Sequence, residues 1–251
     1  MNRYLIWLSF EGGAYCGWQA QPGVATVQQT VNHALSTLLK TPIEVIGAGR
    51  TDTGVHARSF AAHFDLPSGA LAFQEEGLVN KLNRFLPTNI AINKIEAVRP
   101  DFHARYSALS RTYQYHIHTR KDPFLAQSSW FIDRPLQLEA MITATEMLKN
   151  HNDFQCFSKT NTDVKSFLCT VYEAQWHING HVLVFEIRAN RFLRNMVRAI
   201  VGTLIEIALG KREVRDLERI ILSQDRRQAG YSAPGYGLYL TQIEYPEDYR
   251  M

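Results

Sequence analysis

Residues 170–189, TVYEAQWHINGHVLVFEIRA, predict two strands joined by a tight turn. Asn179 and Gly180 stand at the turn, and this pair is the strongest short hairpin signal because both residues tolerate positive φ. Apolar residues alternate with polar ones on both sides of the pair, as in half-buried strands. We therefore expect strands over residues 170–178 and 181–189.

The elements around this hairpin define a fold. A strand is predicted at 111–119 and a helix at 138–150 before it, and a long helix at 192–209 and a strand at 237–245 after it. One extra helix, at 214–223, precedes the last strand. The resulting order, β-α-β-β-α-β, is that of a ferredoxin-like unit.

The first part of the chain repeats this order. Thr26 is followed by Gln29, a capping box that opens a helix with apolar residues at helical spacing. The predicted elements are a strand at 3–11, this helix, strands at 43–46 and 60–66, a helix from Leu71 to Phe85, and a strand at 90–98.

The two halves predict an α+β protein. We expect a ferredoxin-like half at 1–105 that carries a catalytic loop, and a second ferredoxin-like half at 106–251. Side by side they would form one broad, mostly antiparallel sheet with helices on one face and a central cleft. The two halves share no sequence repeat, so only the order of their elements is repeated.

Composition narrows the class of protein. The 251 residues carry a net charge of +3, which permits a polyanionic partner. Three cysteines without CxxC spacing argue against a disulfide framework and a zinc site, and favour a reducing cytoplasm. The sequence has no signal peptide, no membrane-spanning run and no dinucleotide or P-loop fingerprint, so we expect a cytoplasmic protein without a cofactor or metal.

Residues 47–56, GAGRTDTGVH, contain the Asp-Thr-Gly triplet of aspartic proteases. A pepsin-like dyad needs two such aspartates, and this chain has only Asp52. Arg50 stands two residues before Asp52, so both side chains can reach one pocket. The carboxylate could serve as a nucleophile or stabilise positive charge, but the pair could equally fasten a surface loop.

Four arginines lie close together in the sequence: Arg188 near the end of the hairpin, and Arg191, Arg194 and Arg198 after it. No residue from Ile187 through Ile205 is acidic. On a helix beginning after Asn190, Arg191, Arg194 and Arg198 would share one stripe beside the apolar face. Unpaired guanidinium groups are costly there, so we expect a phosphate backbone or a buried carboxylate as their partner.

Aromatic residues and histidines offer weaker signals. Tyr113 and Tyr115 share one face of a predicted strand, where both could be core residues or one could stack on a nucleobase. His116 and His118 lie on the opposite face without a third metal ligand at recognisable spacing. His56 is notable for its place two residues after Gly54.

Taken together, these segments resemble the TruA family of tRNA pseudouridine synthases along essentially the whole chain. The matching motifs are YCGWQ (15–19), GRTD (49–52) with GVH (54–56), NRFLP (83–87), DFHAR (101–105), RTYQY (111–115), NDF (152–154), MVR (196–198) with VG (201–202), and GLYL (237–240). Thr53 stands where this family often has alanine.

The resemblance implies an isomerase that detaches uracil from its ribose, turns it and rejoins it through C5, without a cofactor. It implies that Asp52 is the nucleophile, that Arg198 pairs with Asp52, and that Tyr113 packs on the base and assists removal of the C5 proton. The other residues implied to bind substrate are Arg50, which would hold the nucleotide out of the stack, and His56, Arg191 and Arg194.

The same resemblance implies a substrate and an assembly. The family acts on uridines 38 to 40 in the anticodon arm of tRNA, and works as a homodimer. A polar loop at 160–167 lies where members of the family vary. The alternative is a tRNA-binding protein or chaperone that kept the fold without catalysis, but Asp52, Tyr113 and Arg198 are all present.

Overall fold

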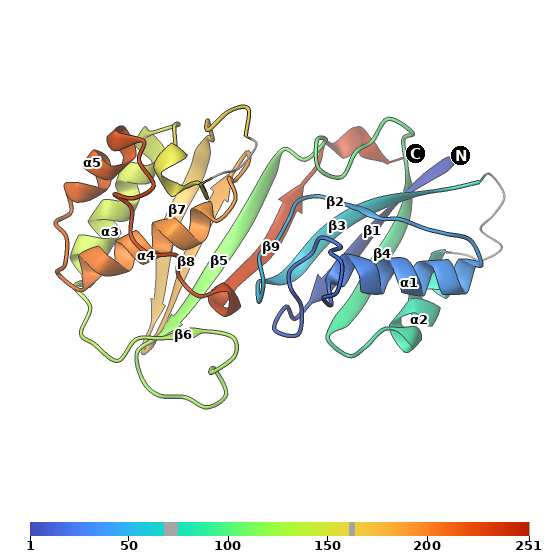
Figure 1. Ribbon diagram of the computed structural model, residues 1–251, viewed down its shortest axis with the longest axis horizontal. Coiled ribbons are helices and arrows are strands. Elements are labelled where there is room, and N and C mark those ends of the chain that lie inside the picture. The colour runs from blue at the N-terminus through green and yellow to red at the C-terminus, as the bar shows by residue number, and fades with distance from the viewer. Residues whose placement is uncertain (68–74, 161–163, 251) are drawn as a thin grey trace. The chain divides into compact units, whose positions relative to one another are not determined.

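The computed structural model describes residues 1–67, 75–160 and 164–250 (Figure 1). These residues form five α-helices and nine strands, and most strand pairs are antiparallel. The α+β class expected from the sequence is confirmed. Leu71, the expected start of the second helix, lies outside the described residues, as do residues 161–163 of the polar loop.

The chain divides into two compact units. One comprises Met1–Leu109 together with Tyr239–Met251, and the other comprises Ser110–Leu238. The sequence predicts a break between residues 105 and 106, with the last segment in the second half. In the structure that segment packs on the first unit, where Tyr245 contacts the edge of Trp7 with ring centroids 5.7 Å apart.

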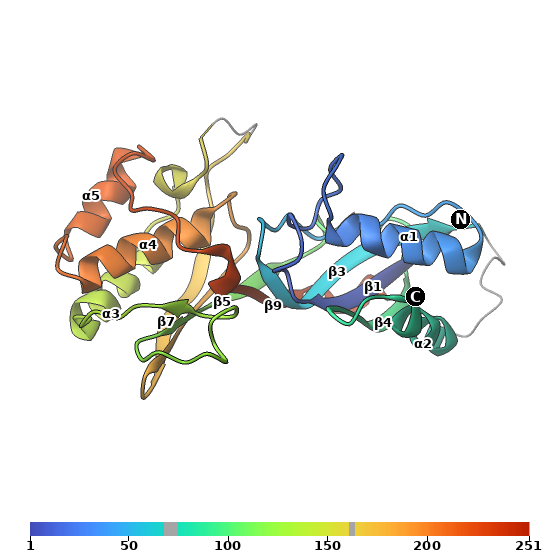
Figure 2. The same cartoon turned by 60° about the horizontal axis from the view of Figure 1, so that its bottom comes forward.

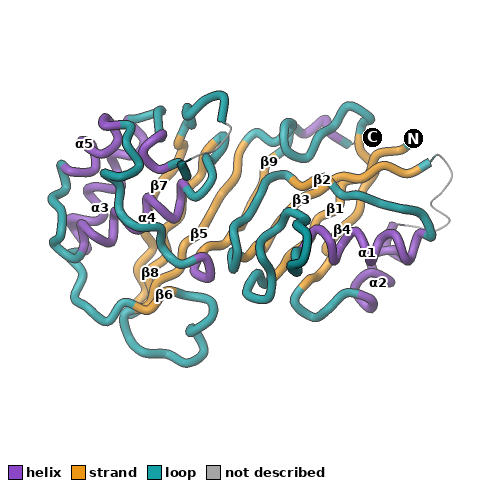
Figure 3. The backbone as a smooth tube through the Cα atoms, in the orientation of Figure 1, coloured by secondary structure: helices purple, strands orange, loops and turns teal. Residues whose placement is uncertain are grey.

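The first unit has the strand order of a ferredoxin-like fold (Figure 3). Strand β1 pairs antiparallel with β4 on one side and with β3 on the other, and β2 pairs with β3. Helices α1 and α2 lie side by side. The elements are β1 (Asn2–Phe10), α1 (Val27–Leu39), β2 (Ile46–Gly47), β3 (His56–Leu66), α2 (Glu75–Phe85), β4 (Ile90–Val98) and most of β9 (Leu238–Glu244).

Helix α1 begins as its capping residue predicts. Thr26 has extended backbone angles, and its hydroxyl accepts the Gln29 N–H at 3.5 Å. The Gln29 side chain returns to the cap through its Oε1, which accepts the Thr26 hydroxyl at 2.8 Å and not the Thr26 backbone N–H of a capping box, while its amide donates to the Gln21 carbonyl at 3.2 Å. The helix ends at Lys40, whose φ of 53° is left-handed.

The strand expected at 43–46 is shorter and later in the structure. The Ile43 N–H donates to the Ser36 hydroxyl at 2.8 Å, and the Val45 N–H donates to the Asn32 side chain at 2.9 Å. Because side chains of α1 take these backbone groups, strand pairing begins only at Ile46, opposite His63 of β3.

The second unit is built around the hairpin predicted at residues 170–189. Gly180 has a φ of +57°, and the strands on either side pair antiparallel, which confirms the predicted turn. Within this unit β8 lies between β5 and β7. The elements are β5 (Ser110–His118), β6 (Trp130–Phe131), α3 (Leu138–Met147) followed by a 3-10 turn (Leu148–Asn150), β7 (Val171–Asn179), β8 (Val182–Ala189), α4 (Met196–Ala208) and α5 (Asp216–Ser223).

The start of α4 differs from the prediction. The helix begins at Met196 and not after Asn190, because Asn195 adopts a left-handed φ of 69° in the preceding turn. The expected stripe of three arginines on one helix is therefore wrong. Arg198 lies on α4, whereas Arg191 and Arg194 lie in the segment before it.

Helix α4 is almost wholly buried. Its apolar residues, among them Ile200, Val201 and Leu204, are inaccessible to solvent. Figure 2 shows α3, α4 and α5 grouped together, and α3 contacts both other helices. Among the described residues, no helix has the length and apolar character needed to cross a membrane.

Candidate active site

The residues singled out by sequence fall into the two units. Arg50, Asp52 and His56 belong to the first unit, and Tyr113, Arg191, Arg194 and Arg198 to the second. Each group is built by its own local contacts.

Asp52 lies in the loop between β2 and β3, and this loop is held from one side by residues 15–18. The Trp18 N–H donates to the Thr51 carbonyl and the Gly54 N–H donates to the Tyr15 carbonyl, both at 3.4 Å. Gly17 has a φ of +85°, and a Cβ atom there would lie 2.3 Å from the Thr51 oxygen. The backbone on both sides of Asp52 is thus fixed by direct contact.

An aromatic cluster packs against the start of the same loop. Trp18 is 1% exposed, and its ring lies 4.1 Å from that of Phe60 on β3. Gly47, at the start of the loop, is so close to Trp18 that an added Cβ would meet the indole nitrogen at 2.5 Å. The first glycine of the GAGRTD run therefore makes room for a tryptophan ring.

The loop turns sharply after Asp52. The Val55 N–H donates to the Asp52 carbonyl at 3.2 Å, and Gly54 has a φ of +78°, which favours glycine. Asp52 is partly buried, whereas Arg50 is exposed. The turn leads directly into β3, so Asp52 stands on a rigid support.

His56 is the first residue of β3 and is 2% exposed. Its Nδ1 accepts the Gly12 N–H at 3.1 Å, and the Glu11 carboxylate lies 3.3 Å from the same nitrogen. Because Nδ1 accepts this hydrogen bond, it carries no proton and donates none to the Glu11 carboxylate. The ring also stacks on Tyr239, with centroids 4.5 Å apart and planes at 18°.

The two tyrosines of β5 differ in burial. Tyr115 is fully buried, and its hydroxyl donates to the Pro234 carbonyl at 2.9 Å, while burial raises its pKa well above the usual range. Tyr113 is only partly buried, and its ring packs at right angles to that of Phe192, with the centroids 5.1 Å apart. Tyr115 is thus a core residue, and Tyr113 keeps a partly accessible side chain.

Arg198 is hydrogen-bonded to the segment that follows α5. Its Nε donates to the Ala233 carbonyl at 2.6 Å, and the Ala233 N–H donates to the Arg198 carbonyl at 3.0 Å. One contact from the side chain and one from the backbone therefore hold Arg198 against residue 233.

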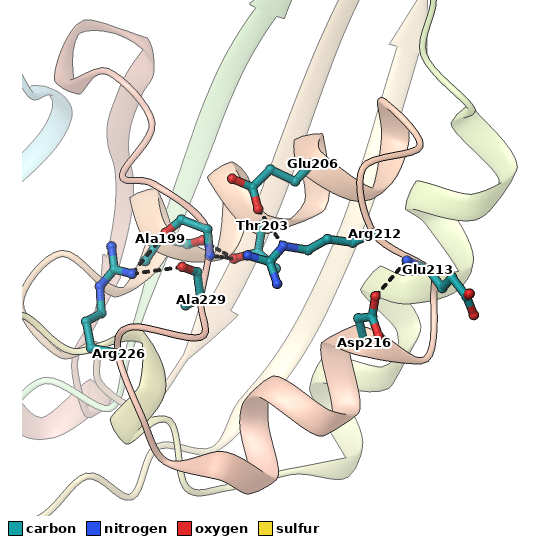
Figure 4. Close-up of polar contacts among 9 residues, drawn as sticks. Ala199, Thr203, Glu206, Arg212, Glu213, Asp216, Arg226 and Ala229 are labelled. Atoms are coloured by element: carbon teal, nitrogen blue, oxygen red, sulfur yellow. Dashed lines mark hydrogen bonds and ion pairs between the residues drawn. The ribbon is translucent and has the colours of Figure 1, made fainter.

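The segment around Ala233 is itself held against α4 (Figure 4). The Gly230 N–H donates to the Thr203 hydroxyl at 2.9 Å, and Arg226 donates to the Gly230 carbonyl at 2.9 Å. A Cβ at Gly202 would lie 1.8 Å from the Tyr231 oxygen. The VG motif at 201–202 does not reveal the role of Gly202, which is to let this segment approach the helix.

The remaining arginines differ in their surroundings. Arg188 donates to Glu173 on the neighbouring strand at 2.6 Å and lies over the Tyr172 ring, so an acid that is distant in sequence partners it. Arg194 is exposed, and its carbonyl accepts the Lys159 N–H. Arg191 is partly buried near Cys169, a thiol whose pKa burial raises to about 11.

No metal site appears in the part of the chain that the structure describes, since no group of three His, Cys, Asp or Glu side chains converges there. His118 contacts the Ser129 hydroxyl at 3.0 Å and stacks on Phe131. Burial lowers the pKa of His118, in keeping with a neutral structural histidine.

Comparison with known proteins identifies the family. The family model described as tRNA pseudouridine synthase matches residues 7–107 and 144–246. The tRNA pseudouridine synthase A of Parabacteroides distasonis is 47% identical over 250 residues, covering 99% of this chain and 98% of that protein. The proteins of the same name from Bacteroides fragilis and Dictyoglomus turgidum are 46% and 38% identical, covering 99% and 98% of this chain and 98% and 100% of theirs.

This chain therefore belongs to the tRNA pseudouridine synthase family. It is an isomerase that acts on uridine in tRNA.

Proposed function

We propose that this isomerase converts uridines 38 to 40 in the anticodon arm of tRNA to pseudouridine, with Asp52 as the nucleophile. The observation that carries the proposal is the fixed loop of Asp52. Backbone contacts from Tyr15 and Trp18 and the close approach of Gly17 hold it. Catalysis by a nucleophile requires such pre-positioning.

The reaction breaks the bond between N1 of uracil and C1′ of ribose and forms a bond from C5 to C1′. The proton of C5 is lost and N1 gains one, so atoms balance without an oxidant or reductant. The carboxylate of Asp52 attacks either C1′ of the ribose or the base. At C1′ it displaces the uracil and is itself displaced when C5 bonds to C1′, whereas on the base it is eliminated in a separate step after the C5–C1′ bond has formed.

The other residues take the roles that the family resemblance implies. Arg198 keeps Asp52 ionised by pairing with it, since a guanidinium next to a carboxylate favours the charged form. Tyr113 packs on the uracil and assists removal of the C5 proton, which its partly accessible side chain supports. Arg50, which is exposed, holds the target nucleotide out of the stack, a step that costs a few kcal/mol.

The enzyme would be cytoplasmic and would act as a homodimer that binds tRNA. Arg191 and Arg194 contact its phosphates from the segment before α4. The net charge of +3 for each chain is modest, but phosphate contacts depend on local charge, and a dimer presents two copies.

A mapping experiment tests the choice of substrate. The full chain is incubated with tRNA transcripts that carry uridine at only one of positions 38, 39 and 40, and pseudouridine is located by mass spectrometry of nuclease fragments. A transcript with cytidine at all three positions is the control. Pseudouridine confined to those positions supports the proposal, and pseudouridine in another arm would contradict it.

A further inference from the structure

Three side chains of the first unit form a stack beside the loop of Asp52. His56 lies at the bottom, and its ring is parallel to that of Tyr239 within 18°. The guanidinium of Arg58 lies over the Tyr239 ring, 5.4 Å from its centroid. His56 is buried, Tyr239 is partly buried and Arg58 is exposed, so the stack runs from the interior to the surface.

The base of the stack is rigid. His56 and Tyr239 face each other across the parallel pairing of β3 with β9. The Gly12 N–H fixes the imidazole through Nδ1, and Gly12 lies so close to the loop that an added Cβ would stand 2.0 Å from the Val55 carbonyl oxygen. Gly12 therefore contacts both the end of the Asp52 loop and the imidazole of His56, on which Tyr239 stacks.

Arg58 differs from Arg3 and Arg99 of the same unit. Arg3 binds Asp65 with two hydrogen bonds of 2.8 Å, and Arg99 binds Asp248 at 2.8 Å. Within the described residues, Arg58 has no ion pair with a carboxylate, and its partner is an aromatic ring. Stacking orients a guanidinium by its face and leaves the N–H groups at its edge able to bind an anion.

We infer that Arg58 is a phosphate-binding residue for the RNA next to the target uridine, and that His56 and Tyr239 are the positioning residues that aim it. This inference rests on the proposed function. Arg58 follows Asp52 by only six residues, across a turn whose backbone is fixed. A nucleotide held out of its stack has a phosphate on each side, and the planar guanidinium matches phosphate geometry.

The inference also gives His56 a different role from direct binding. At 2% exposure its ring cannot cover a nucleotide, but it sets the plane of Tyr239. The imidazole packs on the tyrosine ring, and the guanidinium of Arg58 lies 5.4 Å from the centroid of the same ring, so a ring held by His56 orients Arg58.

The test uses the full chain with Arg58→Ala and Arg58→Lys. The matched control is Arg227→Ala, because Arg227 is also exposed but is paired with Asp225. Arg58→Ala should weaken tRNA binding about three- to tenfold and reduce the slope of log K against log salt by about 0.7 to 0.9, as expected for one lost phosphate contact. Arg58→Lys should keep the salt slope but not the full affinity, since lysine cannot present a planar fork.

A second pair of variants tests the stack itself. Tyr239→Phe keeps the ring and should preserve binding, whereas Tyr239→Leu removes it and should raise KM for tRNA by a similar factor with little change in kcat. Equal effects of the Phe and Leu variants, or an equal salt slope for Arg58→Ala and the wild type, would overturn the inference. A wild-type protein that binds tRNA but forms no pseudouridine would instead count against the proposed function.

Discussion

Gly17 and Thr51 approach so closely that a Cβ atom at position 17 would lie 2.3 Å from the Thr51 carbonyl oxygen. Gly17→Ala should therefore displace the loop that carries Asp52. A displacement of about 1 Å can cost about 100-fold in rate, so we expect kcat for pseudouridine formation to fall by about that factor. Steady-state kinetics with a tRNA transcript measures it.

Gly23→Ala is the matched control for this variant. Gly23 also has a positive φ, 76°, but an added Cβ would meet nothing within 4 Å. The cost should be limited to backbone strain of about 1–2 kcal/mol in stability, with kcat unchanged. Similar losses of kcat in both variants would show that strain and not contact with Thr51 is responsible.

His63 should make the stability of the protein depend on pH. Its ring is 1% exposed, its Nδ1 accepts the Ala104 N–H at 3.1 Å, and burial lowers its pKa to about 4, with the charge of Arg3 acting in the same direction. Between pH 6.5 and 4 the unfolded chain binds a proton at this residue that the folded chain excludes. The free energy of unfolding should therefore fall as pH falls through this window, by up to about 3 kcal/mol.

Urea unfolding at several pH values between 4 and 6.5 measures this effect, with His63→Gln as the comparison. Glutamine can still accept the Ala104 N–H but does not titrate. The free energy of unfolding of the variant should depend less on pH. Part of the dependence remains, because burial also lowers the pKa of His103. Parallel curves for the two proteins would contradict the assignment.

Arg198 should affect turnover more than binding. Arg198→Ala is expected to lower kcat about 100-fold or more, because a charge that supports the nucleophile acts on the chemical step. The dissociation constant for tRNA should change less than about threefold, since one contact is a small part of such an interface. Arg188→Ala, which loses a pair with Glu173, should leave kcat unchanged. A large loss of tRNA binding with normal kcat would remove Arg198 from the catalytic step.

Arg191 and Arg194 should contribute to binding and not to chemistry. Replacing both with alanine should flatten the salt dependence of tRNA binding by about 1.4 to 1.8 in slope, the value for two lost phosphate contacts. Filter binding at several salt concentrations measures the slope. If the slope stays equal to that of the wild type, both residues serve the structure of the segment before α4.

The fold could largely be predicted from local pattern. The Asn179-Gly180 turn, the cap at Thr26 and strand alternation are short-range signals, and they were confirmed. Two of the boundaries that differ have causes that the local pattern does not reveal. Side chains of Ser36 and Asn32 take the N–H groups of residues 43 and 45, and Asn195 interrupts an otherwise helical pattern with a left-handed turn.

The site could be predicted less completely. Alternation places Tyr113 and Tyr115 on the same face, but only Tyr115 is fully buried, packed on Trp130 with its hydroxyl bonded to the Pro234 carbonyl. Burial of His56 under Tyr239 depends on the pairing of strands far apart in sequence. No local pattern reports such contacts.

The central claim is that Asp52 is the nucleophile of a pseudouridine synthase. It is tested most directly by tritium release from tRNA labelled at uridine C5, measured for the wild type and Asp52→Asn side by side, with tRNA binding and thermal stability recorded for both. We predict release by the wild type and none by the variant, with binding and stability nearly equal. Release by Asp52→Asn close to that of the wild type would contradict the account.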